Sequence, residues 1–241
     1  LLNEHGVEVF RTGGFSRLSY PIDGSLTPEG DFVFVGKGEN GETTIRRLNF
    51  MGEPVDFIPE IPVEGWRPQH LTLTRDGHIL TLDSFLDILT KHDSKTGSLL
   101  WRAKISHEGT DDLRLGRPAE SPDGRIYLPC GKEHNVMVFS ADGKILETIG
   151  EFGTGPGKFV FPVGVAMGPG GIVLVLDAMR HKVLMFDSDH SFLSEFGGMG
   201  AAMGQLYHPS AIAASEGGKV YVAQGYDSRV QGFNIRDTKA E

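Results

Sequence analysis

Cysteine is nearly absent from this chain: Cys130 is the one cysteine in 241 residues, so no intrachain disulfide can form. A chain of this length buries most of the apolar surface that its unfolded form exposes, and it needs neither a disulfide nor a metal for stability. Long hydrophobic runs are also absent, which excludes a membrane-spanning helix of about 18 or more apolar residues. No segment combines a helical hydrophobic period with helix caps, so the sequence does not predict an α-helical fold.

Positive charge is in the minority, with 23 Lys and Arg against 32 Asp and Glu and a formal net charge of −9. Nonspecific nucleic-acid binding depends on cations that neutralise phosphates, and the chain has no basic stripe. We therefore expect no nucleic-acid partner. The sequence also lacks G-x-S-x-G, H-E-x-x-H and C-x-x-C-H motifs, so the corresponding hydrolase, metalloprotease and haem sites are not predicted.

Glycine, in contrast, is abundant at 33 residues. Five short segments share one pattern: a turn that ends in glycine is followed by a run of residues typical of β-strands. The turn glycines are each 47 residues apart: Gly30, Gly77, Gly124, Gly171 and Gly218. A fixed period of about 40 to 50 residues indicates a repeat architecture. Residue types common to every repeat then belong to the scaffold, and residues that break the pattern are the better functional candidates.

Each repeat has the pattern of four short strands. In the fourth repeat we expect strands at 161–167, 172–177, 182–187 and 192–198, and the second of these is an almost continuous apolar run suited to burial on both faces. Four-stranded antiparallel units at this period are typical of β-propeller blades. The sequence thus predicts an all-β fold, a single propeller domain over residues 1–241, with repeats at about 15–61, 62–108, 109–153, 154–200 and 201–241 plus 1–14.

The segment FGTGPGKFVFPVGVAMGPGGIVLVLDAMRHKVLMFD resembles NHL-type repeats. The match is close in the fourth and fifth repeats, fair in the third and weak in the first two. The resemblance implies six blades, so one blade would lie outside this chain, whereas five repeats already account for nearly all of it. We favour five. Because residues 6–14 resemble the fourth-strand segment 144–153, we expect residues 7–12 to close the ring as the outer strand of the blade formed by 207–236.

A weaker similarity links the chain to the propeller of peptidyl-α-hydroxyglycine amidating lyase. That enzyme takes zinc-binding histidines from Pro-His steps, and no proline is followed by histidine here. The segment QGYDSRV resembles the segment that carries the enzyme's active-site tyrosine, which makes Tyr226 and Arg229 loop-face candidates. The alternative is that both are ordinary loop residues.

Polar residues two positions after the proline that opens a blade differ between repeats. The first three repeats carry Asp23, His70 and Glu120 there. Two carboxylates and an imidazole on neighbouring inner strands could hold a divalent cation or a polar ligand. The alternative is a solvated polar channel. We predict no other cofactor.

Further candidates have a structural alternative beside the functional one. Asp83 and Asp177 end second strands and are interpreted as loop-fixing residues. Cys130 is either a reactive thiol or, as in most proteins, a small buried side chain. Apolar residues of the blade-opening loops either form an interface patch or pack between blades: Phe15, Trp66, Met199 and Met203.

The favoured function is a noncatalytic NHL-type binding module or scaffold that holds another protein, or a larger assembly, through loops on one face. The alternative is a propeller enzyme of the lyase or lactonase type, with a metal near Asp23, His70 and Glu120. We expect a periplasmic or extracellular location, because the sequence begins without Met, resembles a repeat frequent in exported bacterial proteins, and lacks a catalytic signature.

Overall fold

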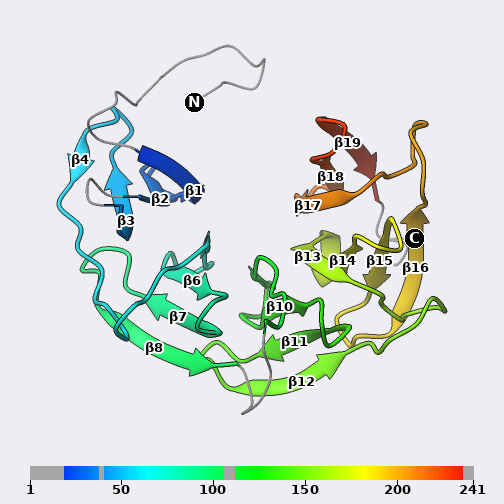
Figure 1. The fold of residues 1–241 in the computed structure, drawn as a ribbon, viewed down its shortest axis with the longest axis horizontal. Helices are drawn as coiled ribbons and strands as arrows, with labels where there is room; N and C mark the ends of the chain where they lie inside the picture. Colours follow the sequence, from blue (N-terminus) through cyan, green and yellow to red (C-terminus); the bar gives the residue numbers. More distant parts are fainter. Residues whose placement is uncertain (1–18, 38–40, 106–111, 236–241) are drawn as a thin grey trace. The chain divides into compact units, whose positions relative to one another are not determined.

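A computed structural model describes residues 19–37, 41–105 and 112–235 and shows an all-β chain of antiparallel sheets (Figure 1). Four sheets have four strands each and the last has three described strands, and sequence neighbours are hydrogen-bonded throughout. This is the blade organisation that the repeat predicts, so the propeller fold is confirmed. Within the described residues the helical content is one 3-10 turn, η1 (Pro169–Gly171), and no helix there has the length and apolarity to cross a membrane.

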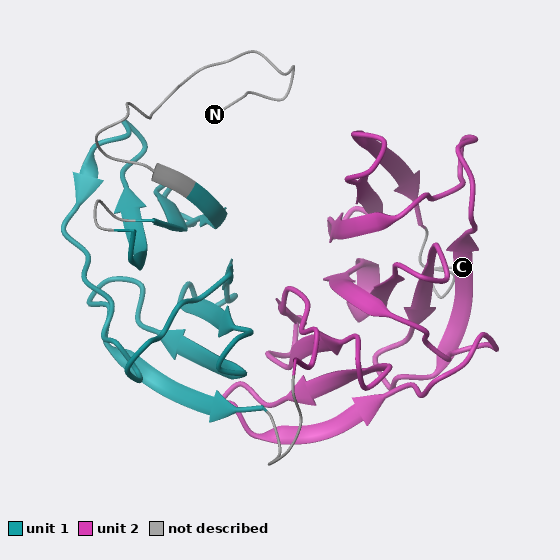
Figure 2. Cartoon of the chain, in the orientation of Figure 1, with its two compact units in different colours: residues 1–105 teal, residues 106–241 magenta. Residues whose placement is uncertain are grey.

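The chain divides into two compact units, residues 1–105 and residues 106–241 (Figure 2). Unit 1 contains the first two blades. Their strands are β1 (Ser19–Leu26), β2 (Phe32–Lys37), β3 (Thr43–Leu48) and β4 (Pro54–Val55), then β5 (His70–Leu73), β6 (Ile79–Asp83), β7 (Ile88–His92) and β8 (Leu99–Lys104).

Unit 2 contains the other three blades. Their strands are β9 (Ala119–Glu120), β10 (Ile126–Cys130), β11 (Asn135–Phe139) and β12 (Ile145–Ile149), then β13 (Pro162–Met167), β14 (Val173–Asp177), β15 (Lys182–Phe186) and β16 (Phe192–Gly197), and finally β17 (Pro209–Ala214), β18 (Lys219–Gln224) and β19 (Arg229–Asn234). The expected outer strand at residues 7–12 lies outside the described residues, and so does Phe15.

The second strands are among the most buried elements of the blades. Every residue of β6, β10 and β14 is buried, as expected for apolar runs with both faces covered. In β18 burial alternates along the strand, because Val220 and Val222 face the fourth blade while Tyr221 on the opposite face is exposed.

The repeated turn glycines connect the first and second strands of each blade. All five have positive φ, between 79° and 91°, a region that favours glycine because it lacks a Cβ. In the first two blades the glycine N–H donates to the carbonyl of Thr27 or Thr74, three residues earlier. The periodic glycine is therefore required by the turn conformation.

Apolar side chains fill the space between neighbouring blades. In unit 1, Val33, Val35 and Ile45 of the first blade pack on Leu71 and Ile79 of the second. In unit 2 one cluster joins the third and fourth blades and another joins the fourth and fifth. Burial of each such side chain contributes about 1.5–3 kcal/mol.

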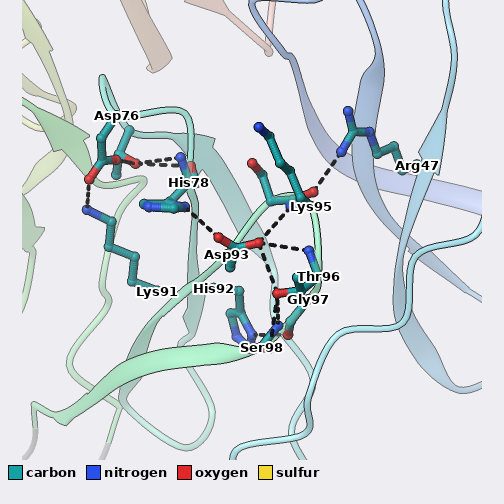
Figure 3. Close-up of polar contacts among 12 residues, drawn as sticks. Arg47, Asp76, His78, Lys91, His92, Asp93, Lys95, Thr96, Gly97 and Ser98 are labelled. Atoms are coloured by element: carbon teal, nitrogen blue, oxygen red, sulfur yellow. Dashed lines mark hydrogen bonds and ion pairs between the residues drawn. The ribbon is translucent and has the colours of Figure 1, made fainter.

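A cluster of polar side chains lies at one end of the second blade, around the turns that join β5 to β6 and β7 to β8 (Figure 3). Lys91 Nζ, which is buried, lies 2.8 Å from Asp76 Oδ2. His78 Nδ1 lies 3.6 Å from Asp93 Oδ2, and Arg47 of the first blade donates to the carbonyl of Ser94 at 2.7 Å. The contact between Arg47 and Ser94 therefore supplements the apolar core between the two blades.

Candidate functional site

Two kinds of loop meet at one edge of each blade. In an antiparallel meander, the loop that precedes the first strand (the leading loop) and the loop between the second and third strands (the 2–3 loop) lie at the same end. Arg180 in a 2–3 loop shows this contact directly, because it donates to the carbonyls of Thr154 at 3.0 Å and Lys158 at 2.6 Å in a leading loop. We call this end of the third to fifth blades the unit 2 loop edge: residues 131–134, 150–161, 178–181, 198–208 and 225–228.

Asp177, the last residue of β14, holds the two loops of the fourth blade together. Its Oδ1 accepts the N–H groups of Met179 and Arg180 at 3.0 and 2.9 Å. Its Oδ2 accepts those of Val160 and Phe161 at 2.6 and 3.1 Å. A buried carboxylate with four backbone donors is satisfied, so the loop-fixing interpretation of Asp177 is confirmed.

Asp83 has the same role at the end of β6 in unit 1. Its Oδ1 accepts the N–H groups of Phe85 and Leu86, both at 3.0 Å, and its Oδ2 accepts that of Arg67 at 2.5 Å. Both aspartates are therefore parts of the scaffold.

Cys130 occupies the equivalent position in the third blade. Its side chain is buried, and its S–H group donates to the carbonyl of Leu113 at 3.3 Å. The buried alternative therefore applies to Cys130, since a reactive thiol requires solvent access.

Gln224 takes the position in the fifth blade, and an amide has only one oxygen. Its Oε1 accepts from the N–H of Tyr207 at 2.6 Å and from Nη2 of Arg229 at 2.9 Å, while its buried Nε2 has no partner among the described residues. The next N–H of the leading loop, that of His208, donates instead to Nδ1 of His181 at 3.3 Å. His208 adopts a φ of 44°, which is uncommon for a residue with a Cβ.

These contacts gather four rings on the fifth-blade side of the loop edge. The ring of Tyr207 stacks on that of His181 with 6.1 Å between centroids, and it lies edge-on to His208 at 4.5 Å and to Tyr226 at 5.4 Å. Burial lowers the pKa of His181, the neighbouring His208 lowers it further, and Asp177 opposes both. The rings contact one another closely, so they form a packed cluster with Tyr226 on its outside.

The predicted loop-face residues of unit 2 have different environments. Tyr226 is 78% exposed, and its hydroxyl has no hydrogen bond to a described residue. Arg229 is partly buried and donates to the carbonyls of Ala201 at 2.5 Å and Gln205 at 3.3 Å, so it also fixes the leading loop. Met203 is 98% exposed at the tip of that loop.

Several large apolar side chains are exposed on the unit 2 loop edge. Five of them are each at least 60% exposed: Phe152, Met179, Met199, Met203 and Tyr226. The sequence singled out three of the five. The exposure of Met179 could have been predicted from the repeat. Met179 is 47 residues before Tyr226 and occupies the same place in its 2–3 loop.

Trp66 of unit 1 does not share this exposure. It is 7% exposed, packs in the core cluster of unit 1 and lies against the ring of His92 with 5.3 Å between centroids. Trp66 therefore packs between blades and is not part of an exposed interface patch.

Asp23 and His70 come together on the inner strands of unit 1. Asp23 Oδ2 lies 3.6 Å from His70 Nδ1 and accepts the N–H of Leu71 at 3.0 Å, while Oδ1 accepts the N–H of Gly24 at 2.8 Å. Glu120 lies in unit 2, on the short strand β9. Among the described residues there is no group of three or more His, Cys, Asp or Glu side chains arranged to hold a metal ion.

Residues 84–198 match the DUF5128 family model, described as 6-bladed beta-propeller. The matched segment is just under half of the chain and covers the end of the second blade and all of the third and fourth. No curated protein matches the chain.

Several solved structures share the fold. A streptogramin B lyase is 17% identical, with a TM-score of 0.69 over 100% of this chain and 76% of that chain. A chain of the nidogen/laminin complex is 18% identical, with a TM-score of 0.63 over 89% and 76%. A putative gluconolactonase is 15% identical, with a TM-score of 0.58 over 93% and 80%. At these identities the likeness shows a propeller fold, which enzymes and other proteins share.

Proposed function

We propose that this protein is a noncatalytic propeller of the NHL type that binds another protein through the unit 2 loop edge. The observation that carries the proposal is the presence of five exposed apolar side chains on adjacent loops. Methionine and aromatic residues are enriched in protein interfaces, and gathered apolar residues mark binding surfaces.

The loops beneath these side chains are held in one arrangement, which supports the proposal. Asp177 and Arg180 fix the leading loop of the fourth blade, and Gln224 and Arg229 fix that of the fifth. Ordering loops on binding costs free energy, so loops that are already ordered favour affinity.

The charges on this edge favour a protein over an RNA partner. Lys158 Nζ lies 2.7 Å from Glu151 Oε1, and Arg229 Nε lies 3.3 Å from Asp227 Oδ2. Cations that are paired with carboxylates inside the loops are less able to neutralise phosphates. The neighbour in the nidogen/laminin complex also supports a role of this fold in protein assembly.

The test uses three exposed residues and a matched control. Partners of the native protein would be captured by crosslinking and identified, and the purified partner would be titrated against the triple variant Phe152→Ser, Met203→Ser, Tyr226→Ser. We expect affinity to fall by about tenfold or more, as for loss of interface hot spots. The control, Leu146→Ser with Leu193→Ser, changes exposed residues of β12 and β16. Equal affinity of the triple variant and the wild type would refute the proposal.

We also propose that this protein binds its partner in the periplasm or the extracellular space, as part of a larger assembly. Fractionation of the native source with an antibody to this protein tests the location. Recovery from the cytosolic fraction alone would refute it.

One observation favours a second candidate, an enzyme of the lyase or lactonase type. The carboxylate of Asp23 is fixed by two backbone N–H groups and lies beside His70, which is partly exposed. Such a pair could contribute two ligands to a divalent cation. Metal analysis of the purified protein and melting with added Ca²⁺ or Zn²⁺ test this. Absence of stoichiometric metal together with unchanged melting would exclude it.

A further inference from the structure

Two histidines occupy equivalent places in unit 2 but have opposite hydrogen-bonding roles. His134 and His181 are 47 residues apart, each ends a 2–3 loop, and their φ values are 55° and 56°. Nδ1 of His134 lies 2.7 Å from the carbonyl oxygen of Val160, which can only accept, so this Nδ1 carries a proton. Nδ1 of His181 accepts the N–H of His208, so it carries none. His181 is therefore neutral, with its proton on Nε2.

The unusual acceptor follows from Gln224. In the fourth blade the N–H of Phe161 donates to the carboxylate of Asp177. His208 is the equivalent residue in the fifth blade, 47 positions later, where Gln224 replaces the aspartate. The single amide oxygen of Gln224 is occupied by Tyr207 and Arg229, so the N–H of His208 has no carboxylate oxygen to donate to.

His208 has an unfavourable backbone conformation at this contact. Its φ of 44° is positive and it precedes Pro209, and both features restrict a residue that has a Cβ. Its N–H makes one hydrogen bond, to His181, and its ring lies against Tyr207 and Tyr226. The exposed Tyr226 therefore lies against a residue whose N–H group is bonded to a nitrogen that can take up a proton.

The charged and titratable groups around His181 come from four elements. Within its own strand and loop, Asp177 is bound by four backbone N–H groups, and Arg180 and Lys182 both pair with Glu195 of β16. The leading loop contributes Tyr207 and His208, and Tyr226 lies beyond them. The nearest carboxylates, Asp177 and Glu195, are therefore already bound by other groups. The neighbouring imidazole of His208 disfavours a positive charge on His181.

We propose that His181 is a pH-sensitive latch for the leading loop of the fifth blade. Protonation places a hydrogen on Nδ1, so His181 can no longer accept the N–H of His208 and directs a donor at it. His208 then leaves the left-handed conformation, and the cluster of Tyr207, His208 and Tyr226 rearranges. An effect on partner binding rests on the proposed function, but the loop change does not. Because burial lowers the pKa of His181, we expect the transition below the ordinary histidine range of about 6.5.

The test is amide hydrogen exchange by NMR, corrected for intrinsic rates, from about pH 7.5 to about pH 5. We expect the protection factor of the His208 amide to fall by about tenfold or more as His181 titrates. The Phe161 amide is the matched control, because its acceptor is a carboxylate, and its protection should stay constant. Nitrogen shifts of the imidazoles should show an unprotonated Nδ1 in His181 and a protonated one in His134 at the higher pH.

Two variants separate the latch from general destabilisation. His181→Phe keeps a ring to stack on Tyr207 but removes the acceptor, so the His208 amide should be unprotected at both pH values. His134→Phe should leave the His208 amide unchanged. Constant protection of His208 across the titration, or full protection in His181→Phe, would overturn the latch. If His181→Phe does not fold, the wild-type titration decides alone. A latch without partner binding would refute only the proposed function, and binding without a latch only this inference.

Discussion

At the scale of single residues, a few buried polar groups that fix loops contribute strongly to the stability of the fold. Asp177 accepts four backbone N–H groups from two loops while fully buried. An unsatisfied buried donor costs about 1–3 kcal/mol. One carboxylate therefore stabilises two loops of the unit 2 loop edge, the leading loop and the 2–3 loop of the fourth blade.

The first prediction concerns this carboxylate. Asp177→Asn replaces one acceptor oxygen by a donor, and two N–H groups then face an amide nitrogen. We expect the free energy of unfolding to fall by about 2–4 kcal/mol in urea denaturation. Asp142→Asn, in an exposed turn, should leave it nearly unchanged. A change in Asp177→Asn as small as in this control would contradict the loop-fixing role.

A second residue-scale prediction concerns pH. Burial favours the neutral form of Asp76, but hydrogen bonds from Lys91 and Thr74 outweigh it and lower the pKa of Asp76 to about 2, from 3.8. A lowered carboxyl pKa stabilises the fold above the unfolded value, and this stabilisation is lost as pH falls toward the folded value. We expect the unfolding free energy to decrease between about pH 4 and pH 2.

Asp76→Asn isolates this contribution. The variant should be less stable at neutral pH, because Lys91 is left buried without its carboxylate, and its stability should vary less between about pH 4 and pH 2. Asp76 is half exposed, so the loss is expected to be moderate, about 1–2 kcal/mol. A pH profile parallel to that of the wild type would rule out this role for Asp76.

At the scale of elements, glycines of the same conformation differ in how closely the chain packs around them. Gly77 and Gly97 both end turns in the second blade, with φ of 80° and 78°. A Cβ on Gly97 would lie 2.3 Å from the carbonyl oxygen of Ile58, whereas a Cβ on Gly77 would have no atom within 4 Å. The turn between β7 and β8 is therefore packed by its backbone against the segment that follows β4.

Alanine at these two positions gives a matched comparison. Gly77→Ala should cost about 1–2 kcal/mol, the cost of a left-handed residue with a Cβ. Gly97→Ala adds a clash between backbone atoms and should cost at least about 2 kcal/mol more. Chemical denaturation measures both. Equal losses would show that the Ile58 segment moves away without cost.

At the scale of the whole molecule, the sequence predicts that residues 7–12 complete the last blade. The described part of that blade has three strands, β17 to β19, where the other four blades have four. We expect deletion of residues 1–12 to lower the melting temperature by several degrees, because a strand that completes a sheet would be lost. Melting equal to that of the full chain would exclude this closure. The six-blade alternative stays a prediction, and the matched family model is six-bladed.

The sequence by itself determined the repeat, and through it the fold. A turn that needs positive φ selects glycine, and a strand with both faces buried selects a continuous apolar run, so both leave marks at a spacing of 47 residues. The loop-fixing roles of Asp83 and Asp177 could be read from the same register, because their N–H donors are local or lie in the adjoining loop.

Only the tertiary structure decided which apolar loop residues are exposed. Trp66 and Met203 are both large and apolar, yet one packs between blades and the other is in solvent, a difference set by neighbouring blades rather than local pattern. The same holds for His134 and His181. They share a position and a backbone conformation, but their hydrogen-bonding roles differ because the partners come from a loop about 26 residues away, and Gln224 alters the partner of only one.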